Sequence, residues 1–505
     1  MKSLQSILTV LTEVIAIRGN VERNVRALRY DSRSVEKGDL YVAVNGLDDR
    51  ALGFVPDAVA AGAETILLDD PEHMPQSGEG VTWVLVRDAR KGMAEVAAFL
   101  FDYPMHDLQL YGITGTNGKT TTAHVLKSLL KGSGESTGMI GTLGMTIDST
   151  VPTGYTTPES PELMRMLAEM RNAGVKNVVM EVSSHAMTLK RVDGLRFAGG
   201  IFTNITQDHL DFHTTFEDYL NAKKRFFDRL DRHAHAVVNI DDLHGTTMAR
   251  DSNATIIRYG YRSDADLRIS NTTLAPNGSA WVVTLSDLLG GGEINLRTPL
   301  TGSFNVMNVT AACGLAIAAG IDRSRLVDLV SQLTPVPGRM ETLRLHNGVA
   351  VVVDYAHTPD ALESLLKTTR QFVGEGQLIV VFGCGGDRDR GKRPIMGEIA
   401  SRLADRIYIT SDNPRSEDPD KIIDEILEGV SRPTTDVHRI ADRRKAIELA
   451  LQEAQADDIV VVAGKGHETY QIIGSDRHDF DDREVVRHWD REKENLREQN
   501  QHSTR

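Results

Sequence analysis

The feature that most limits the possible folds of this chain is a glycine-rich turn between an apolar run and an amphipathic pattern. The turn reads Gly115-Thr116-Asn117-Gly118-Lys119-Thr120-Thr121, after LQLYGIT and before AHVLKSLLKG. In this setting, backbone N–H groups and the helix start hold phosphates, the lysine neutralises their oxygens and the next hydroxyl can bind Mg²⁺. We therefore predict a phosphate loop that binds ATP or GTP. Ile113 stands where the strict motif has its first glycine, so the loop is a variant, and a plain strand–helix turn is the alternative.

The length of the chain and the order of its patterns predict three α/β domains. One hydrophobic core rarely serves more than ~300 residues, and this chain has 505. Residues 1–108 alternate short apolar runs with helical stretches, which indicates a small N-terminal α/β domain. Residues 109–337 hold the phosphate loop and further strand patterns, so we expect a central P-loop ATPase domain with a mostly parallel sheet. Residues 338–505 contain three apolar runs that end in polar or glycine-rich loops, which favours a Rossmann-like α/β domain.

Composition excludes some classes of function. The net charge of -14 argues against a protein whose main partner is nucleic acid. No apolar run approaches the ~18 residues of a membrane span, and the first twenty residues predict an amphipathic helix and not a signal peptide. The two cysteines, Cys313 and Cys384, make a disulfide framework improbable. We expect a cytoplasmic protein without membrane insertion.

Polar residues follow two of the central apolar runs. Glu181 ends KNVVMEV, and Asn204, Asp208 and His209 come just after GGIFTNI. Oxygen ligands at strand ends near a phosphate loop suit Mg²⁺, although a lone carboxylate there is often structural. The segment from Asp208 to His213 has two Asp and two His in six residues, so zinc is an alternative. We favour Mg²⁺, because the phosphate loop already requires it.

Ten motifs together resemble those of one enzyme family. In order, they are GTNGKTT, EVSSH, TNITQDHLDFH, YLNAK, TGSFNVMN, PGRME, DYAHTPDAL, GCGGDRDRGKRP, SDNPR and GKGHE. With them the chain resembles the Mur ligases over nearly its whole length. The resemblance implies an ATP-dependent, ADP-forming amide ligase for cell-wall peptidoglycan synthesis, whose domains bind the UDP substrate, ATP and an amino acid in that order. It implies an acyl-phosphate intermediate, small-molecule partners and a monomer.

The motif from Asp412 to Arg415 resembles that of the members that add meso-diaminopimelate to UDP-N-acetylmuramoyl-L-alanyl-D-glutamate. Diaminopimelate has an extra carboxylate that a planar guanidinium can hold in a bidentate pair, whereas lysine lacks it. The alternatives are L-lysine as acceptor, a ligase like folylpolyglutamate synthase, and a regulatory P-loop ATPase that ligates nothing.

The resemblance also implies roles for individual residues. Lys119, Glu181, His209 and Lys223 match the catalytic positions. Those around the nucleotide are the loop Gly115–Thr121 and Asn305, Asn308, Arg339, Asp354 and His357. The metal ligands would be Thr120, Glu181, His209 and Lys223, the last as a carbamate. Positions for the UDP substrate are Ser32, Thr156, Thr157, Ser183 and Arg191; those for the amino acid are Arg388, Asp412, Asn413, Pro414, Arg415, Gly464 and Glu468.

Lys223 is the position where the residues and the resemblance disagree. It is followed by Lys224 and Arg225, and such a run of cations by itself predicts a solvated helix face.

Overall fold

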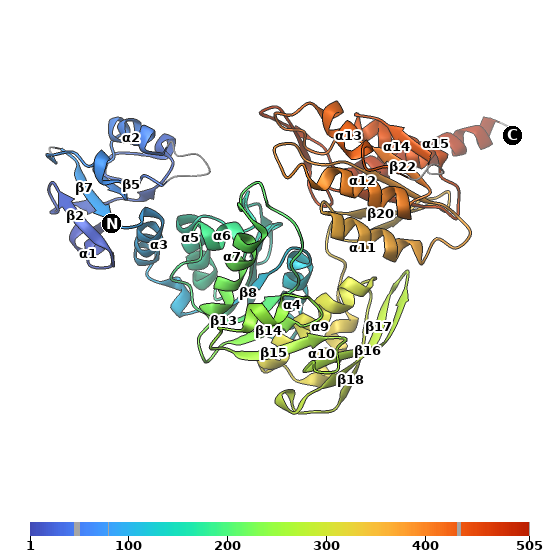
Figure 1. The fold of residues 1–505 in the computed structure, drawn as a ribbon, viewed down its shortest axis with the longest axis horizontal. Coiled ribbons are helices and arrows are strands. Elements are labelled where there is room, and N and C mark those ends of the chain that lie inside the picture. The colour runs from blue at the N-terminus through green and yellow to red at the C-terminus, as the bar shows by residue number, and fades with distance from the viewer. Residues whose placement is uncertain (45–50, 79, 432–435, 504–505) are drawn as a thin grey trace.

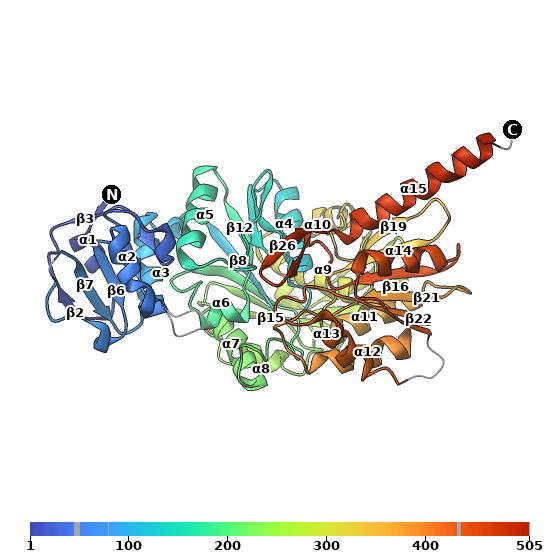
Figure 2. The same ribbon diagram turned by 90° about the horizontal axis from the view of Figure 1, so that it is seen from above.

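The computed structural model describes residues 1–44, 51–78, 80–431 and 436–503. Three sheets follow one another along the chain, with the N-terminal one at one end of an elongated molecule and the C-terminal one beside the central one (Figures 1 and 2). The class expected from the sequence, α/β with a mostly parallel central sheet, is confirmed. The domain limits at 108 and 337 stay predictions. Among the described residues, no helix has both the length and the apolar content to cross a bilayer.

The first sheet has five strands in the order β2-β7-β6-β5-β4, and only the β2–β7 pair is antiparallel. Apolar side chains bury both of its faces under short helices. The strands are β2 (Val14–Arg18), β4 (Leu28–Arg29), β5 (Leu40–Val42), β6 (Thr65–Leu68) and β7 (Thr82–Val86); β1 (Lys2–Ser3) pairs with β3 (Asn24–Val25); the helices are α1 (Leu4–Leu8), α2 (Val55–Ala61) and α3 (Ala89–Leu100).

The central sheet has eleven strands in the order β11-β10-β9-β12-β8-β13-β14-β15-β16-β17-β18, and all pairs from β9 to β16 are parallel. The strands are β8 (Gln109–Thr114), β9 (Thr137–Gly141), β10 (Gly144–Thr146), β11 (Thr150–Val151), β12 (Asn177–Glu181), β13 (Phe197–Phe202), β14 (His235–Asn239), β15 (Thr255–Gly260), β16 (Leu267–Ala275), β17 (Gly278–Leu285) and β18 (Glu293–Thr298). Because β8 lies inside the parallel part, the turn after it opens at the sheet edge where such folds bind ligands.

Helices cover both faces of this sheet. α4 (Lys119–Gly132) and α9 (Ser303–Ala318) share one core, in which the predicted apolar face of α4, Val125, Leu126, Leu129 and Leu130, is buried. Residues of α5 and α7 belong to the core on the other face. The remaining central helices are α5 (Ser160–Asn172), α6 (Ser184–Thr188), α7 (Phe216–Asp228), α8 (Gly245–Ala249) and α10 (Arg323–Ser331).

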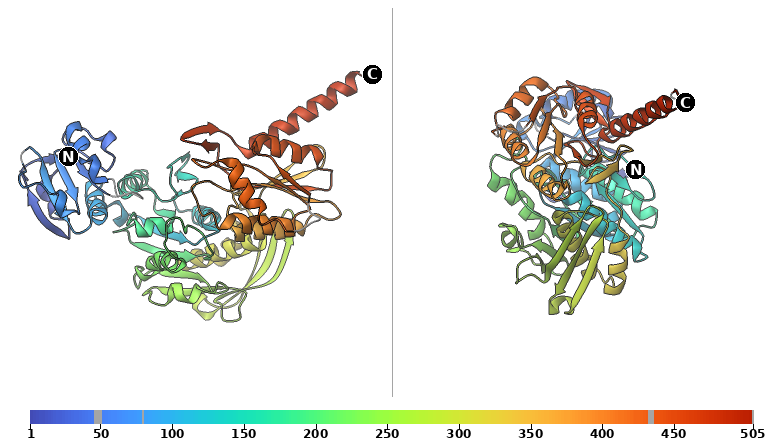
Figure 3. Two further views of the ribbon diagram at one scale, coloured as in Figure 1. Left: turned by 45° about the horizontal axis from the view of Figure 1, so that its top comes forward. Right: turned by 90° about the vertical axis from the view of Figure 1, so that its right-hand side faces the viewer.

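The C-terminal sheet has six strands in the order β19-β20-β24-β21-β22-β23, and only β19–β20 is antiparallel. A separate hairpin, β25 (Tyr470–Ile473) and β26 (Asp476–Asp479), follows it. The last helix, α15 (Asp482–Ser503), projects from the body (Figure 3). The other elements are β19 (Glu341–Arg344), β20 (Ala350–Asp354), β21 (Leu378–Phe382), β22 (Arg406–Ile409), β23 (Asp436–Arg439), β24 (Ile459–Ala463), α11 (Pro359–Arg370), α12 (Lys392–Leu403), α13 (Pro419–Leu427) and α14 (Arg443–Glu453).

Candidate active site

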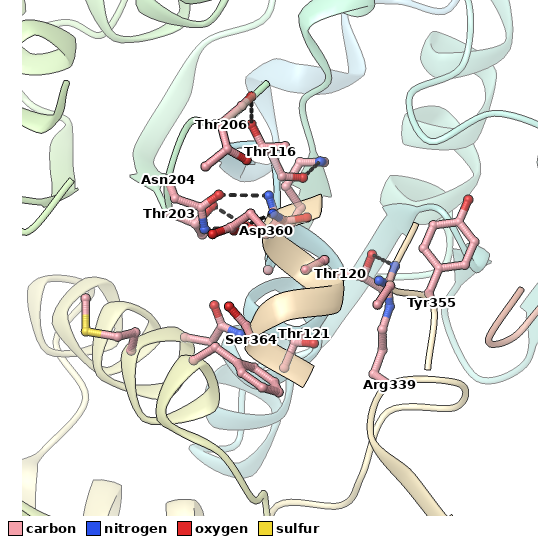
Figure 4. A pocket seen from close by; sticks show the side chains of 18 of the residues that line it. Thr116, Thr120, Thr121, Thr203, Asn204, Thr206, Arg339, Tyr355, Asp360 and Ser364 are labelled. Atoms are coloured by element: carbon pink, nitrogen blue, oxygen red, sulfur yellow. Dashed lines mark hydrogen bonds between the residues drawn. The ribbon is translucent and has the colours of Figure 1, made fainter. Parts of the chain in front are cut away.

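A cavity of about 440 Å³ lies between the central and C-terminal sheets. The turn after β8 and the start of α9 line it from the central part. Arg339, Tyr355, Asp360 and Ser364 line it from the C-terminal part (Figure 4). Most of the residues expected around the nucleotide line it, and so do the predicted metal ligands Glu181 and His209. The former are Thr116, Asn117, Gly118, Lys119, Thr120, Thr121, Asn308, Arg339, Asp354 and His357. Asn305 lies behind Asn308, whose amide nitrogen is 3.4 Å from Asn305 Oδ1.

Two glycines give the predicted phosphate loop its shape. Gly115 has φ +152° and Gly118 has φ +85°, which side chains rarely adopt. A Cβ on Gly115 would lie 1.9 Å from Thr203 Oγ1, and one on Gly118 would lie 2.4 Å from Asn308 Oδ1. The loop is therefore packed tightly against β13 and α9, and its backbone N–H groups keep one fixed arrangement.

Two lysines converge on the same carbonyl of this loop. Lys119 Nζ donates to Gly115 O at 3.0 Å and to Thr116 O at 2.8 Å, while Lys223 Nζ donates to Gly115 O at 2.7 Å. Lys223 is 1% exposed and lies 4.5 Å from the ring centroid of Tyr219. The solvated face that the residues alone predicted is wrong for Lys223, although Arg225 is exposed.

A signal for this burial is present in the sequence of α7. Tyr219, Lys223, Phe226 and Phe227 follow one another at helical spacing on the apolar face of the helix. Lys223 therefore occupies a core position, while Lys224, one residue on, pairs with Asp228 at 2.6 Å.

The environment of Lys223 favours a neutral amine. Burial lowers its pKa well below the usual value, and the charge of Lys119 lowers it further. Burial also lowers the pKa of Lys119, but the carboxylates of Glu181 and Asp208 oppose that shift.

The predicted metal ligands Thr120 and Glu181 are in direct contact. Thr120 Oγ1 donates to Glu181 Oε2 at 3.0 Å, and the buried carboxylate also accepts from Thr142 N at 2.8 Å. From the C-terminal part, the Arg339 guanidinium donates to Thr120 Oγ1 at 3.0 Å (Figure 4). Hydroxyl and carboxylate oxygens are the donors that Mg²⁺ prefers.

His209 lies beside this pair in a strained backbone conformation, with φ +56°. Burial lowers its pKa to about 3, so the imidazole is neutral at physiological pH and able to bind a metal. No group of three or more His, Cys, Asp or Glu in the described part of the chain is arranged to hold a metal. Instead, His185 stacks on Phe212 and meets the rings of His209 and His213.

Residues after β20 complete the cavity from the C-terminal side. Asp360 Oδ2 accepts from Asn117 Nδ2 at 3.0 Å, and Tyr355 lies under the Arg339 guanidinium at 4.5 Å (Figure 4). Asp354 Oδ2 accepts from Met340 N at 2.7 Å, which fixes the backbone that carries Arg339. Burial lowers the pKa of His357 to about 4. The sequence analysis missed Asp360 and Tyr355, although both lie in the DYAHTPDAL motif.

Four of the five residues predicted for the UDP substrate form one cluster next to Glu181. Thr157 Oγ1 donates to Glu181 O at 2.8 Å and accepts from Ser183 N at 3.2 Å. Thr156 Oγ1 is 3.1 Å from Thr142 Oγ1, and Arg191 donates to Thr157 O at 2.9 Å.

The fifth residue, Ser32, lies in the N-terminal part, in a 3₁₀ turn at Ser32–Ser34. Tyr30, just before it, is hydrogen-bonded to Glu162 of α5, and Arg90 pairs with Glu159 at 3.1 Å. These two contacts join the N-terminal part to the central one near the cluster around Thr157.

The residues predicted for the amino acid lie on loops after β21, β22 and β24, which are neighbours in the sheet. Asn413 Nδ2 donates to Glu468 Oε2 at 2.9 Å. Gly464 has φ +114°, and a Cβ there would lie 2.6 Å from Asp412 Oδ2. Pro414 lies in the loop after β22, with Asp412. Its carbonyl packs against Gly386, in the loop that carries Arg388.

Arg415 and Arg388 concentrate positive charge in this pocket. Burial lowers the pKa of Arg415, and the charge of Arg388 adds to the shift. Their recorded hydrogen bonds go to backbone carbonyls, at 2.7 Å from Arg415 to Gly386 O and 2.8 Å from Arg388 to Asp387 O. A carboxylate bound here would relieve the repulsion and pair with the guanidinium groups.

The hairpin of β25 and β26, which the sequence analysis did not identify, supports this pocket. Ile472 N donates to Asn413 Oδ1 at 3.0 Å, and Gln471 Nε2 donates to Asp412 O at 2.7 Å. Arg415 N donates to Ile472 O at 3.1 Å, and Gly474 N to Arg415 O at 2.7 Å. These bonds hold Arg415 at φ +52°. The run YQIIGSDRHD, with Gly-Ser between two extended stretches, was the available signal.

Comparison with known proteins agrees with this geometry. Residues 113–316 match the Mur ligase middle domain, and residues 338–466 match the Mur ligase glutamate ligase domain. A Bacillus cereus protein named UDP-N-acetylmuramoyl-L-alanyl-D-glutamate--2,6-diaminopimelate ligase is 41% identical over 471 residues, which are 92% of this chain and 93% of the relative. The chain belongs to the Mur ligase family.

Two further comparisons extend over nearly the whole of this Mur ligase. A Clostridium acetobutylicum relative, UDP-N-acetylmuramoyl-L-alanyl-D-glutamate--2,6-diaminopimelate ligase 1, is 42% identical over 474 residues, 93% of this chain and 95% of the relative. A solved structure of a UDP-N-acetylmuramoyl-L-alanyl-D-glutamate--2,6-diaminopimelate ligase is 34% identical, with a TM-score of 0.67. It covers 98% of this chain and 100% of its own.

Proposed function

We propose that this Mur ligase uses ATP to join meso-diaminopimelate to UDP-N-acetylmuramoyl-L-alanyl-D-glutamate, a step of peptidoglycan precursor synthesis. The observation that carries the proposal is the side-chain cluster in which Arg415 and Arg388 lie close together near Glu468. Two guanidinium groups suit the carboxylates of diaminopimelate, and Glu468 suits an ammonium. L-Lysine lacks the second carboxylate of diaminopimelate, so Arg415 would have no carboxylate partner. The names of the relatives support the same acceptor.

The three parts of the chain divide the substrates among them. The UDP substrate binds to residues 1–108, which include Ser32, and to the central cluster of Thr156, Thr157, Ser183 and Arg191. Residues 109–337 bind ATP on the phosphate loop, and residues 338–505 bind the amino acid. A monomeric state and a cytoplasmic location stay predictions.

The reaction begins when the D-glutamate carboxylate attacks the γ-phosphate of ATP, which gives an acyl phosphate and ADP. The amine of the amino acid then attacks the carbonyl carbon, and inorganic phosphate leaves as the amide forms. Lys119 and the N–H groups between Gly115 and Thr120 stabilise the charge on the transferred phosphoryl group, which is the main requirement of such a transfer. Arg339 donates to Thr120 of the loop, and Asn308 packs against Gly118.

The donor set beside the loop fits Mg²⁺. Thr120 and Glu181 present oxygen atoms 3.0 Å apart, and His209 is neutral. The ion would neutralise phosphate charge when it is bound there. Lys223 would join these ligands as a carbamate. Its neutral amine would attack CO₂, with a C–N bond formed and a proton released, so that a buried neutral amine becomes an anionic oxygen ligand.

The decisive test follows oxygen from the carboxylate. With the D-glutamate side-chain carboxylate labelled by ¹⁸O, we expect one label in the inorganic phosphate released. ADP production over many turnovers should require both the UDP substrate and diaminopimelate, because the acyl phosphate is consumed only when the amine attacks it. Unlabelled phosphate, or ATP turnover independent of both substrates, contradicts the mechanism. A parallel assay with L-lysine tests the acceptor, because equal use of both amino acids contradicts the role of Arg415.

A further inference from the structure

A buried lysine that the mechanism above does not use connects two residues of the amino-acid pocket. Lys465 lies in the loop after β24, and its side chain is 0% exposed. Its ammonium donates to Asn413 Oδ1 at 3.1 Å and to Glu468 Oε2 at 2.8 Å. A buried ammonium is costly unless hydrogen bonds and an opposite charge compensate it, so these contacts are essential to its placement.

The three side chains form a closed triangle, because Asn413 Nδ2 donates at 2.9 Å to the same Glu468 Oε2. Lysine has only donors, so Lys465 requires the oxygen of Asn413 on its side. The backbone N–H of Ile472 also donates to Asn413 Oδ1, at 3.0 Å, so it too requires the oxygen on this side. The amide of Asn413 is thereby fixed, with its oxygen toward Lys465 and its nitrogen toward Glu468.

The triangle also decides what Glu468 offers to a substrate. Both of its bonds inside the triangle go to Oε2, which leaves the accepting capacity of Oε1 for a ligand. The ammonium of Lys465 compensates the charge of the carboxylate from the buried side. Glu468 is therefore held in one orientation without a substrate, and binding does not have to immobilise it.

We propose that Lys465 is a positioning residue for binding of the incoming amino acid, acting through Glu468 and Asn413. The inference rests on the proposed function, because it takes these two residues as the binding site for the incoming amino acid. Lys465 itself does not touch the substrate. It orients Glu468 Oε1 toward an ammonium, and Arg415 and Arg388 select the carboxylates.

The test is Lys465→Met in the full-length enzyme, with steady-state kinetics for all three substrates. We expect KM for meso-diaminopimelate to rise at least about tenfold, the scale for removing one partner of a buried charge pair. KM for ATP and for the UDP substrate should stay within about twofold, since the triangle lies outside the cavity that binds ATP. Acyl-phosphate formation without amino acid, trapped by borohydride reduction, should continue at the wild-type rate.

A double-mutant cycle separates positioning from a merely structural role. If Lys465 acts through Glu468, adding Glu468→Gln to Lys465→Met should raise KM for diaminopimelate much less than Glu468→Gln does in the wild type. Independent, multiplying effects overturn the proposal. So does a loss confined to thermal stability, or an equal rise in all three KM values. Lys465→Gln replaces Lys465→Met if the latter does not fold.

Exposed Lys421, in the first turns of α13, provides the matched control. Lys421→Met removes a cation from the same part of the chain and should leave every constant unchanged. A wild-type enzyme that uses no diamino acid overturns the proposed function. If the wild-type enzyme uses diaminopimelate and Lys465→Met has the same KM for it, only the proposed role of Lys465 is overturned.

Discussion

At the scale of single residues, Lys119 is the cation that the phosphate loop itself supplies. It is tied to Gly115 O and Thr116 O, so it is already held in place before a nucleotide binds. Lys119→Ala should abolish ATP-dependent ligation and leave the fold intact, because a buried cation with a lowered pKa contributes little to stability. ADP release and circular dichroism measure the two effects. Lys131→Ala, at an exposed site of the same helix, is the control, and near-normal activity of Lys119→Ala contradicts the phosphate-loop role.

Lys223 allows a second prediction at this scale. Lys223→Ala should inactivate the enzyme, and formate or acetate should restore part of the activity by replacing the carbamate oxygens. Native mass spectrometry of the wild type should show the mass of one added CO₂, which decreases as the pH falls and the amine is protonated. Lys224→Ala, which removes the ion pairs with Asp228 and Asp251 near the surface, should have little effect on activity. Full activity of Lys223→Ala refutes the assignment.

The residue scale also shows what the sequence could and could not predict. Lys119, Thr120 and Glu181 were predictable, because a phosphate loop and a strand end place their side chains by local geometry. The charged neighbours of Lys223 predict exposure, although the apolar spacing of α7 indicates burial. Its contact with Gly115, 108 positions away, depends on the tertiary fold. The same holds for Lys465, whose partner Asn413 is 52 positions away.

At the scale of elements, local patterns predicted the buried strands and the apolar face of α4, but not the support of the amino-acid pocket. The hairpin of β25 and β26 is short and mostly polar, so its pattern alone gives no reason to place it on the loop after β22. The backbone bonds with Arg415 and Asn413 determine its place.

Gln471 tests whether this hairpin matters for binding. Its side chain donates to Asp412 O at 2.7 Å, and Gln471→Ala removes one hydrogen bond without touching a charge. We expect KM for diaminopimelate to rise by about two- to tenfold, which corresponds to ~0.5–1.5 kcal/mol. KM for ATP should not change. Gln452→Ala, at an exposed site of α14, is the control. An unaltered KM for diaminopimelate in Gln471→Ala means that the hairpin does not position the acceptor motif.

At the scale of the whole molecule, three partly buried histidines predict a loss of stability in acid. Burial lowers the pKa of His124 and His357 to about 4 and that of His467 to about 3, from 6.5. At a pH between the folded-state pKa values and 6.5, the unfolded chain binds more protons than the folded protein does. The free energy of unfolding should therefore fall as the pH falls from 6.5 toward 4. Thermal unfolding across this range measures it. His124→Gln should make the free energy of unfolding depend less on pH, whereas the control His488→Gln, at an exposed site, should not. An unchanged pH dependence in His124→Gln contradicts the argument.

The junction between the central and C-terminal parts determines whether the two walls of the ATP cavity meet. Gly338 lies there with φ +65°, and a Cβ would be 2.1 Å from His467 N, in the loop that also holds Lys465. Its neighbour Arg339 reaches across to Thr120. Gly338→Ala must therefore displace either Arg339 or that loop, and we expect activity to fall more than about tenfold.

Gly374→Ala is the matched control for this junction, because it has nearly the same backbone strain at φ +58° and open space around its Cβ. Gly374→Ala should lower the free energy of unfolding by only ~1 kcal/mol, because of its strained backbone conformation, and the enzyme should keep its activity. Small-angle X-ray scattering with and without an ATP analogue should show an altered domain arrangement for Gly338→Ala alone. Wild-type activity in Gly338→Ala would mean that the cavity walls adjust independently of this junction.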